Sequence, residues 1–166
     1  MVHLELNLRK LFQHCCQEYL YKLFFLFYYF TLNCEIKYKS FVFRKAEYEN
    51  SFKLEARMAR ELSQFIRENL SYFQGFEKVI LYYDNGQHEL NRILNTVLAT
   101  QLADYDVRKV IPNEYRLFQV ADLICTLELL KVKVECGKLS NSEERIFHSV
   151  RKLKKDFLKG IHKKEF

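Results

Sequence analysis

KVILYY, the stretch at residues 78–83, is followed directly by Asp84, Asn85 and Gly86. A continuous run of β-branched and aromatic residues is typical of a strand that is covered on both faces. The Asp-Asn-Gly sequence is a turn signal, and apolar residues recur after it at helical spacing: Leu90, Ile93, Leu94, Val97, Leu98 and Leu102. The sequence therefore predicts a central strand, a short turn and an amphipathic helix, which together make an α/β unit.

Three elements are predicted on the N-terminal side of this strand. Residues 5–31 contain no helix breaker and predict a helix, although the aromatic run at residues 23–30 also fits a strand. Residues 35–44, EIKYKSFVFR, alternate in part and predict a strand with four buried positions, Ile36, Tyr38, Phe41 and Phe43. Apolar residues then recur at helical spacing from Phe52 to Phe73, which predicts a long amphipathic helix that ends near Gly75.

Three further elements are predicted on its C-terminal side. Residues 107–111 form a short predicted strand that Pro112 stops, and residues 116–134 form a strongly apolar predicted helix. Ser140 or Asn141 is the expected N-cap of a last helix, whose apolar stripe is Ile146, Val150, Leu153, Phe157 and Ile161. The fold class that we expect is α/β, with a mixed sheet of a few strands flanked by helices.

The composition indicates one domain over residues 1–166. The chain has 166 residues, 49% of them apolar, and its one proline and four glycines form no linker. A chain of this length has room for a single hydrophobic core. Within it we distinguish an atypical helical and aromatic N-terminal segment at residues 1–33 from an α/β core with a basic C-terminal helix at residues 34–166.

The cysteine pattern and the hydropathy predict a cytoplasmic protein with no membrane partner. Five cysteines occur without a CxxC pair or a Cys/His ligand spacing, which argues against a disulfide framework and a zinc site. The apolar run at residues 23–30, LFFLFYYF, is well short of the roughly 20 residues that cross a membrane.

The positive charge is concentrated near the C-terminus. The net charge is +6, and residues 138–166 carry nine Lys or Arg side chains against four Asp or Glu, a contribution of +5. Such a segment can neutralise phosphates, so we expect DNA or RNA to bind through Arg151, Lys152 and Lys155. The alternative is an ordinary solvated helix face.

Two acids, Asp84 and Asp122, are candidate catalytic residues and metal ligands because apolar residues surround them in the sequence. Burying a carboxylate is costly unless a cation or a metal compensates its charge. Carboxylates at a strand end and on a packed helix can converge on Mg²⁺ or Mn²⁺, and two such ions support phosphodiester hydrolysis. The alternatives are an Asx turn at Asp84 and an ion pair at Asp122.

The segments EKVILYYDNGQHELNRIL, residues 77–94, and EYRLFQVADLICTLELL, residues 114–130, resemble the bacterial family called domain of unknown function 3800. The resemblance extends from about Tyr38 to the C-terminus. It implies a ribonuclease H-like fold and a divalent-metal nuclease-type site that contains Asp84 and Asp122. It also implies three amide side chains beside that site, on Asn85, Gln87 and Gln119.

The sequence departs from that family at its N-terminus. Family members open with a strand that carries an Asp-Glu-Ser motif, and no such string occurs in this sequence. The chain therefore resembles a truncated member whose first strands are missing. We expect exposed strand edges that favour self-association, and a poor or inactive nuclease, because two carboxylates hold Mg²⁺ weakly.

Two alternatives to an enzyme remain from the sequence. In the first, the chain is a non-catalytic module that binds nucleic acid or a protein, with exposed strand edges that recruit a partner chain. In the second, it is a fragment with no independent activity.

Overall fold

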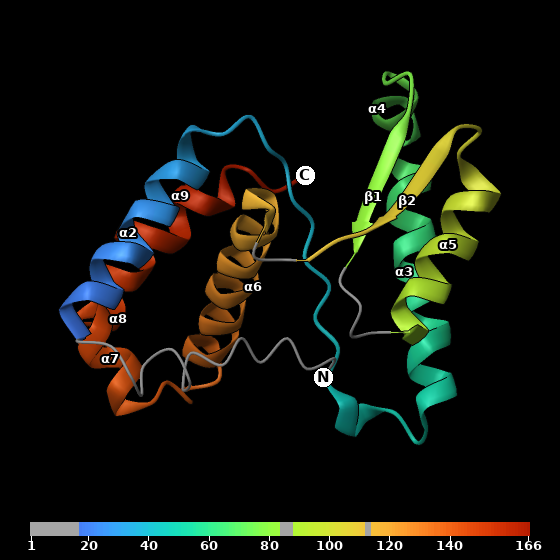
Figure 1. The fold of residues 1–166 in the computed structure, drawn as a ribbon. Helices are drawn as coiled ribbons and strands as arrows, with labels where there is room; N and C mark the ends of the chain where they lie inside the picture. The colour runs from blue at the N-terminus through green and yellow to red at the C-terminus, as the bar shows by residue number, and fades with distance from the viewer. Residues whose placement is uncertain (1–16, 84–87, 112–113) are drawn as a thin grey trace. The chain divides into compact units, whose positions relative to one another are not determined.

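The computed structural model describes residues 17–83, 88–111 and 114–166 (Figure 1). The contacts among these residues divide them into two compact units, which are described separately below. Unit 1 is Phe41–Tyr115, and unit 2 combines residues 17–40 with Arg116–Phe166. Because a unit defined by its contacts need not fold alone, the single domain over residues 1–166 stays a prediction.

Unit 1 is an α/β layer built on a parallel pair of strands. Its elements are η1 (Lys45–Glu47), α3 (Ser51–Glu68), α4 (Leu70–Gln74), β1 (Val79–Tyr83), α5 (His88–Gln101) and β2 (Tyr105–Lys109). β1 and β2 run parallel in a register that pairs Val79 with Tyr105 and Tyr83 with Lys109. The α/β class is confirmed, although the described strands form a parallel sheet rather than a mixed one.

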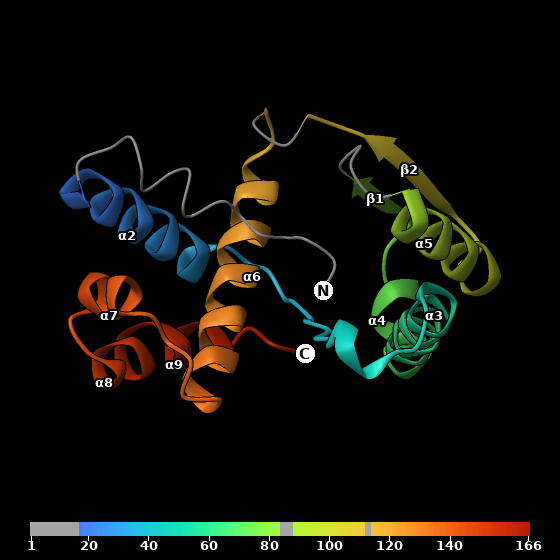
Figure 2. The ribbon, with the colours of Figure 1, turned by 90° about the horizontal axis from the view of Figure 1, so that it is seen from below.

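The core of unit 1 lies between the helices and one face of the sheet. Figure 2 shows α5 and α3 on the same side of the two strands. Its buried residues come from α3, from α5 and from the position after α5: Ile66, Ile93, Val97, Leu98 and Leu102. Val79 and Leu81 of β1 pack against them.

The prediction that residues 78–83 form a central strand covered on both faces is wrong. Within the described residues β1 pairs with β2 alone, and its burial alternates along the strand. Ile80 and Tyr82 remain 36% and 37% exposed. The reason is that the helices of this unit cover one face of the sheet only. A continuous apolar run does not show whether one or both faces of its strand are covered.

The long helix predicted from Phe52 to Phe73 is interrupted at Asn69. Asn50 is the N-cap of α3, and its side chain accepts a hydrogen bond from the Lys53 N–H at 2.9 Å. The Asn69 side chain donates to the Phe65 carbonyl at 2.9 Å and competes with the helical bonding pattern there. α4 then continues to Gln74, so the predicted end near Gly75 is confirmed.

Unit 2 is helical. Its elements are α2 (Gln17–Asn33), α6 (Arg116–Glu135), α7 (Asn141–Phe147), α8 (Val150–Lys152), the π-helix η3 (Leu153–Leu158) and α9 (Lys159–His162). α2 lies beside α6 and α9 (Figure 1). The most deeply buried side chains of its core are Tyr28, Val120, Leu127, Leu130, Leu153, Phe157 and Ile161.

The strand predicted over residues 35–44 is wrong, because no neighbouring strand offers it a ladder of hydrogen bonds within the described chain. One parallel bridge joins Tyr38 to Glu165. The Tyr38 N–H donates to the Lys164 carbonyl at 3.0 Å, and the Phe166 N–H donates to the Tyr38 carbonyl at 3.1 Å. Tyr38 is buried as expected, whereas the predicted buried positions Ile36, Phe41 and Phe43 are only half-buried.

The last predicted helix is divided after its first two turns. Ser140 caps α7 through a capping box with Glu143, which confirms the predicted start. His148 then adopts a left-handed conformation with φ of 61°, and Ser149 caps α8. The predicted stripe is confirmed in its second half, where Leu153, Phe157 and Ile161 are buried.

Across the helices that the structure describes, none has both the length and the apolar character that a membrane crossing requires.

Candidate nucleic-acid interface

The predicted phosphate-binding cations lie on the exposed side of the C-terminal segment. Arg151 and Lys152 belong to α8 and Lys155 to the π-helix η3, and all three are exposed. The opposite side of this segment carries Leu153 and Phe157, which are almost fully buried. Because burial of the apolar stripe fixes the rotation of the helix, the basic side chains are left facing solvent.

These cations are not neutralised by the described residues. Ion pairs of unit 2 use other lysines, such as Lys131 with Glu128 and Lys133 with Glu143. Within the described chain, no carboxylate pairs with Arg151, Lys152 or Lys155, and the same holds for two more exposed lysines, Lys154 and Lys159. The segment can therefore exchange its counterions for phosphates without first breaking an ion pair.

Tyr28 of α2 holds the π-helix in place from the core side. Its hydroxyl group lies 2.7 Å from the Asp156 carbonyl oxygen and 3.0 Å from the Phe157 carbonyl oxygen, to which it donates. Burial raises the pKa of Tyr28, and the charges of Tyr29 and Asp156 raise it further, so the hydroxyl remains a donor. A π-helix does not follow the normal α-helical hydrogen-bond pattern. The Tyr28 hydroxyl group donates to two of its carbonyl groups.

Asp122 and Gln119 lie three residues apart on α6, and both are half-buried. Residues at this spacing lie on one face of a helix, so α6 carries these two predicted site residues on the same face. The Asp122 carboxylate also affects its neighbour Cys125, whose thiol pKa is raised first by burial and then by Asp122 and Glu128.

The other predicted ligand, Asp84, lies outside the described residues, as do Asn85 and Gln87. The next residue, His88, is the exposed first residue of α5. Among the described residues, no three His, Cys, Asp or Glu side chains gather into a group that could hold a metal. The convergence of Asp84 and Asp122 on one cation therefore stays a prediction.

The same helix carries another acid, Glu128, which is buried and which the sequence does not distinguish as a site residue. It is 6% exposed, accepts a hydrogen bond from the Tyr38 hydroxyl at 2.8 Å and pairs with Lys131 at 3.3 Å. Burial, the bond to Glu128 and the charges of Glu128 and Glu165 raise the pKa of Tyr38 above its usual value. Glu128 also has leucines on both sides in the sequence, the signal by which Asp122 was chosen.

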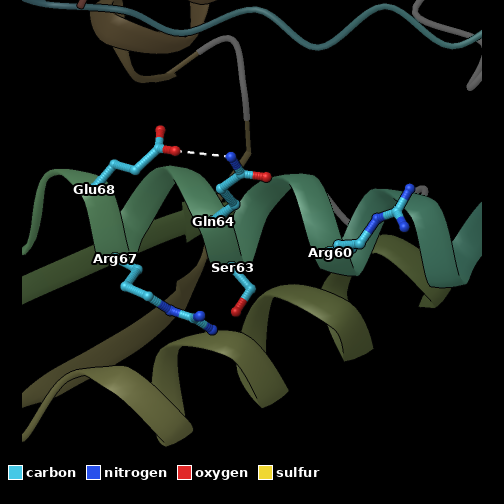
Figure 3. A pocket seen from close by; sticks show the side chains of 5 residues that line it. All are labelled: Arg60, Ser63, Gln64, Arg67 and Glu68. Atoms are coloured by element: carbon cyan, nitrogen blue, oxygen red, sulfur yellow. Dashed lines mark hydrogen bonds between the residues drawn. The ribbon is translucent and has the colours of Figure 1, made fainter.

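An open cavity of about 400 Å³ lies along α3 in unit 1, and no predicted site residue lines it (Figure 3). Its walls are Arg60, Ser63, Gln64, Arg67 and Glu68. Gln64 donates to Glu68 at 2.7 Å, and Figure 3 shows this pair directed away from Ser63 and Arg67. The lining groups therefore do not converge on one point.

Comparison of the chain with models of protein families, with curated proteins and with solved structures finds no significant match.

Proposed function

We propose that this chain binds nucleic acid through the cations of its C-terminal segment and that Asp84 and Asp122 belong to a nuclease-type site for Mg²⁺ or Mn²⁺. In this proposal the chain is a ribonuclease H-like protein akin to domain of unknown function 3800. The observation that carries it is the exposed set of Arg151, Lys152 and Lys155, none of which pairs with a carboxylate of the described residues.

The chemistry of the proposed metal site follows from its donors. Carboxylate oxygens are the ligands that Mg²⁺ and Mn²⁺ prefer, and Asp122 offers one from a half-buried position. A bound ion would polarise a phosphodiester and activate water. In this proposal Asn85, Gln87 and Gln119 hold a water or a phosphate oxygen. Because two carboxylates alone hold a divalent ion weakly, we expect slow cleavage or none.

Nucleic-acid binding is tested by charge reversal. In fluorescence anisotropy with labelled DNA and RNA, the double variant Lys155→Glu/Lys159→Glu should bind much more weakly than wild type. The matched control is Arg60→Glu/Arg67→Glu, which changes the net charge equally at two exposed arginines of α3. Equal loss of affinity in both double variants would show that net charge alone drives binding, and would contradict an interface on the C-terminal segment.

Metal binding is tested by calorimetry with Mn²⁺. Weak uptake should disappear in Asp84→Asn and in Asp122→Ala, while Asp104→Asn, a change at an exposed aspartate, leaves it unchanged. Uptake that survives both site variants would refute the metal site. Efficient Mn²⁺-dependent cleavage that Asp84→Asn abolishes would instead show that these two carboxylates suffice.

A second candidate function is self-association through the sheet of unit 1. Within the described residues β1 and β2 form a two-stranded sheet, so each strand has one edge without a partner strand. Such edges can pair with a second copy of the chain. Analytical ultracentrifugation measures self-association. A stable dimer that shows no Mn²⁺ uptake in calorimetry and no nucleic-acid binding in anisotropy favours this second function.

A further inference from the structure

The buried side of the C-terminal segment repeats every four residues. Leu153, Phe157 and Ile161 are 0%, 2% and 1% exposed. A regular α-helix completes a turn in about 3.6 residues, so three residues at this spacing would spread over about 80° of its circumference. Their equal burial indicates instead that residues four apart lie almost in line along this segment.

The π-helix η3 accounts for this straight line. The Lys159 N–H donates to the Lys154 carbonyl, five residues back along the chain. Because a π-turn contains more residues than an α-turn, four residues there fall short of a full turn and offset the excess from α8 and α9. The two hydrogen bonds from the Tyr28 hydroxyl group to η3 hold this geometry in place.

The same repeat places four cations in one row on the solvent side. Positions two residues away from the buried ones lie opposite them, and each is an exposed cation: Arg151, Lys155, Lys159 and Lys163. We call these four residues the cation row. No carboxylate of the described residues pairs with any of them. The single acid of residues 150–163, Asp156, is one position off the row.

We infer that the cation row binds consecutive phosphates along one strand of a single-stranded nucleic acid. This inference rests on the proposed function and adds the strandedness of the ligand. Four helical residues advance by about 6 Å, which is close to the step between neighbouring phosphates of an extended strand. Each cation can therefore contact a phosphate of its own, as in proteins whose charged surfaces follow a single-stranded backbone.

A duplex fits a straight row of cations less well. Its strands complete a turn in about 10 base pairs, so four consecutive phosphates of one strand rotate by about 105° around the duplex axis. A rigid duplex strand would leave the ends of the cation row without a phosphate. A single strand is flexible enough to follow the whole row.

The cation row also suits a nucleic acid better than a lipid surface. A helix that lies in a membrane interface inserts large apolar side chains. Within residues 150–163, all of which the structure describes, no large apolar side chain is exposed. The charge is local as well, because residues 138–166 contribute +5 of the net charge of +6.

The test is anisotropy with a short fluorescein-labelled oligothymidylate and a blunt duplex of equal length, both in EDTA so that no cleavage occurs. Wild type should prefer the single strand. Lys155→Gln and Lys159→Gln should each lower the slope of log affinity against log salt by about 0.7, which is about fivefold in affinity at about 0.1 M salt. Lys155→Arg keeps the charge and should bind like wild type.

The matched control is Lys154→Gln. It removes the same charge from an exposed lysine of the same segment, one position off the cation row. We expect it to lower the slope by less than half as much as Lys155→Gln. Equal losses in these two variants, or duplex binding as tight as single-strand binding, would overturn the inference.

Failure of the inference is distinguishable from failure of the proposed function. If wild type prefers the duplex and Lys155→Glu/Lys159→Glu abolishes that binding, the inference fails and nucleic-acid binding by the segment stands. A wild type that binds neither oligonucleotide refutes both. Stronger competition by polyglutamate or by vesicles of anionic lipid than by unlabelled oligothymidylate would assign the cation row to that anion and overturn the inference.

Discussion

Gly160 lies against the Tyr28 hydroxyl group, and this contact requires the absence of a side chain. A Cβ atom at residue 160 would lie 2.2 Å from the Tyr28 oxygen and 3.3 Å from the ring carbon that carries it. Tyr28 is itself 3% exposed and bonded to the π-helix, so it cannot move away without losing those bonds.

We therefore expect Gly160→Ala to lower the free energy of unfolding by about 1–3 kcal/mol, the usual cost of overpacking a core. Thermal or urea unfolding measures this change. The control is the double variant Tyr28→Phe/Gly160→Ala: because it lacks the hydroxyl group, the added methyl group should cost less than in the wild-type background. Simple additivity of the two changes would contradict the contact.

The exposure of some residues could be predicted from their sequence neighbours, and that of others could not. Exposure of Arg151, Lys152 and Lys155 follows from the sequence, because these residues flank an apolar stripe that must be buried. The exposure of Tyr82 could not be predicted, because the continuous apolar run KVILYY does not show that one face of β1 is exposed. Asp84 and Asp122 were selected by the same kind of pattern that also describes Glu128, which is bonded to Tyr38 and Lys131. A pattern of residue types does not reveal the partner that satisfies a buried charge.

At the level of elements, the start of α7 depends on a titratable group. The Glu143 carboxylate accepts hydrogen bonds from the Ser140 N–H and hydroxyl group, both at 2.8 Å, and from Lys133. Burial of this carboxyl opposes ionisation, but Lys133 and Ser140 outweigh it and hold the pKa of Glu143 below its usual value. The capping box therefore works best with an ionised glutamate.

The resulting stability should depend on pH below about 4.3, the unfolded pKa of glutamate. Because the pKa is lower in the folded chain, the stabilisation is fully present above that value and is lost as the pH falls through the folded pKa. Glu143→Gln should lower the free energy of unfolding by about 1.5 kcal/mol at neutral pH and flatten its acid dependence. Thermal unfolding across pH measures both effects, and Glu144→Gln, at an exposed neighbour, should change neither.

Helices were predicted well because their apolar periodicity is local. The predicted helices at residues 90–102 and 116–134 correspond to α5 and α6, and the short strand at residues 107–111 corresponds to β2 with a shift of two residues. Residues 35–44 have the composition of a strand but lack a partner strand, which is a property of distant residues. The break at His148 was not foreseen, because a left-handed residue at a helix end is usually glycine.

At the scale of the whole molecule, the uneven charge predicts a strong salt dependence of binding. Each phosphate contact contributes a slope of about −0.7 to −0.9 to the dependence of log affinity on log salt concentration. Lys155→Glu/Lys159→Glu should therefore reduce the slope by about 1.4 to 1.8, as measured by anisotropy at several salt concentrations. A slope equal to that of wild type would show that these lysines do not contact phosphates.

The order of residues in unit 2 has a consequence for how the protein is made. Unit 1 is one continuous stretch, whereas α2 belongs to a core whose other helices follow residue 115. On the ribosome, unit 1 has all its residues before α6 has been synthesised. At that stage Phe157 has not been synthesised, so its three contacts in α2 lack their partner: Phe24, Phe25 and Tyr28. During that interval the nascent chain displays an aromatic segment, the kind of surface that chaperones bind.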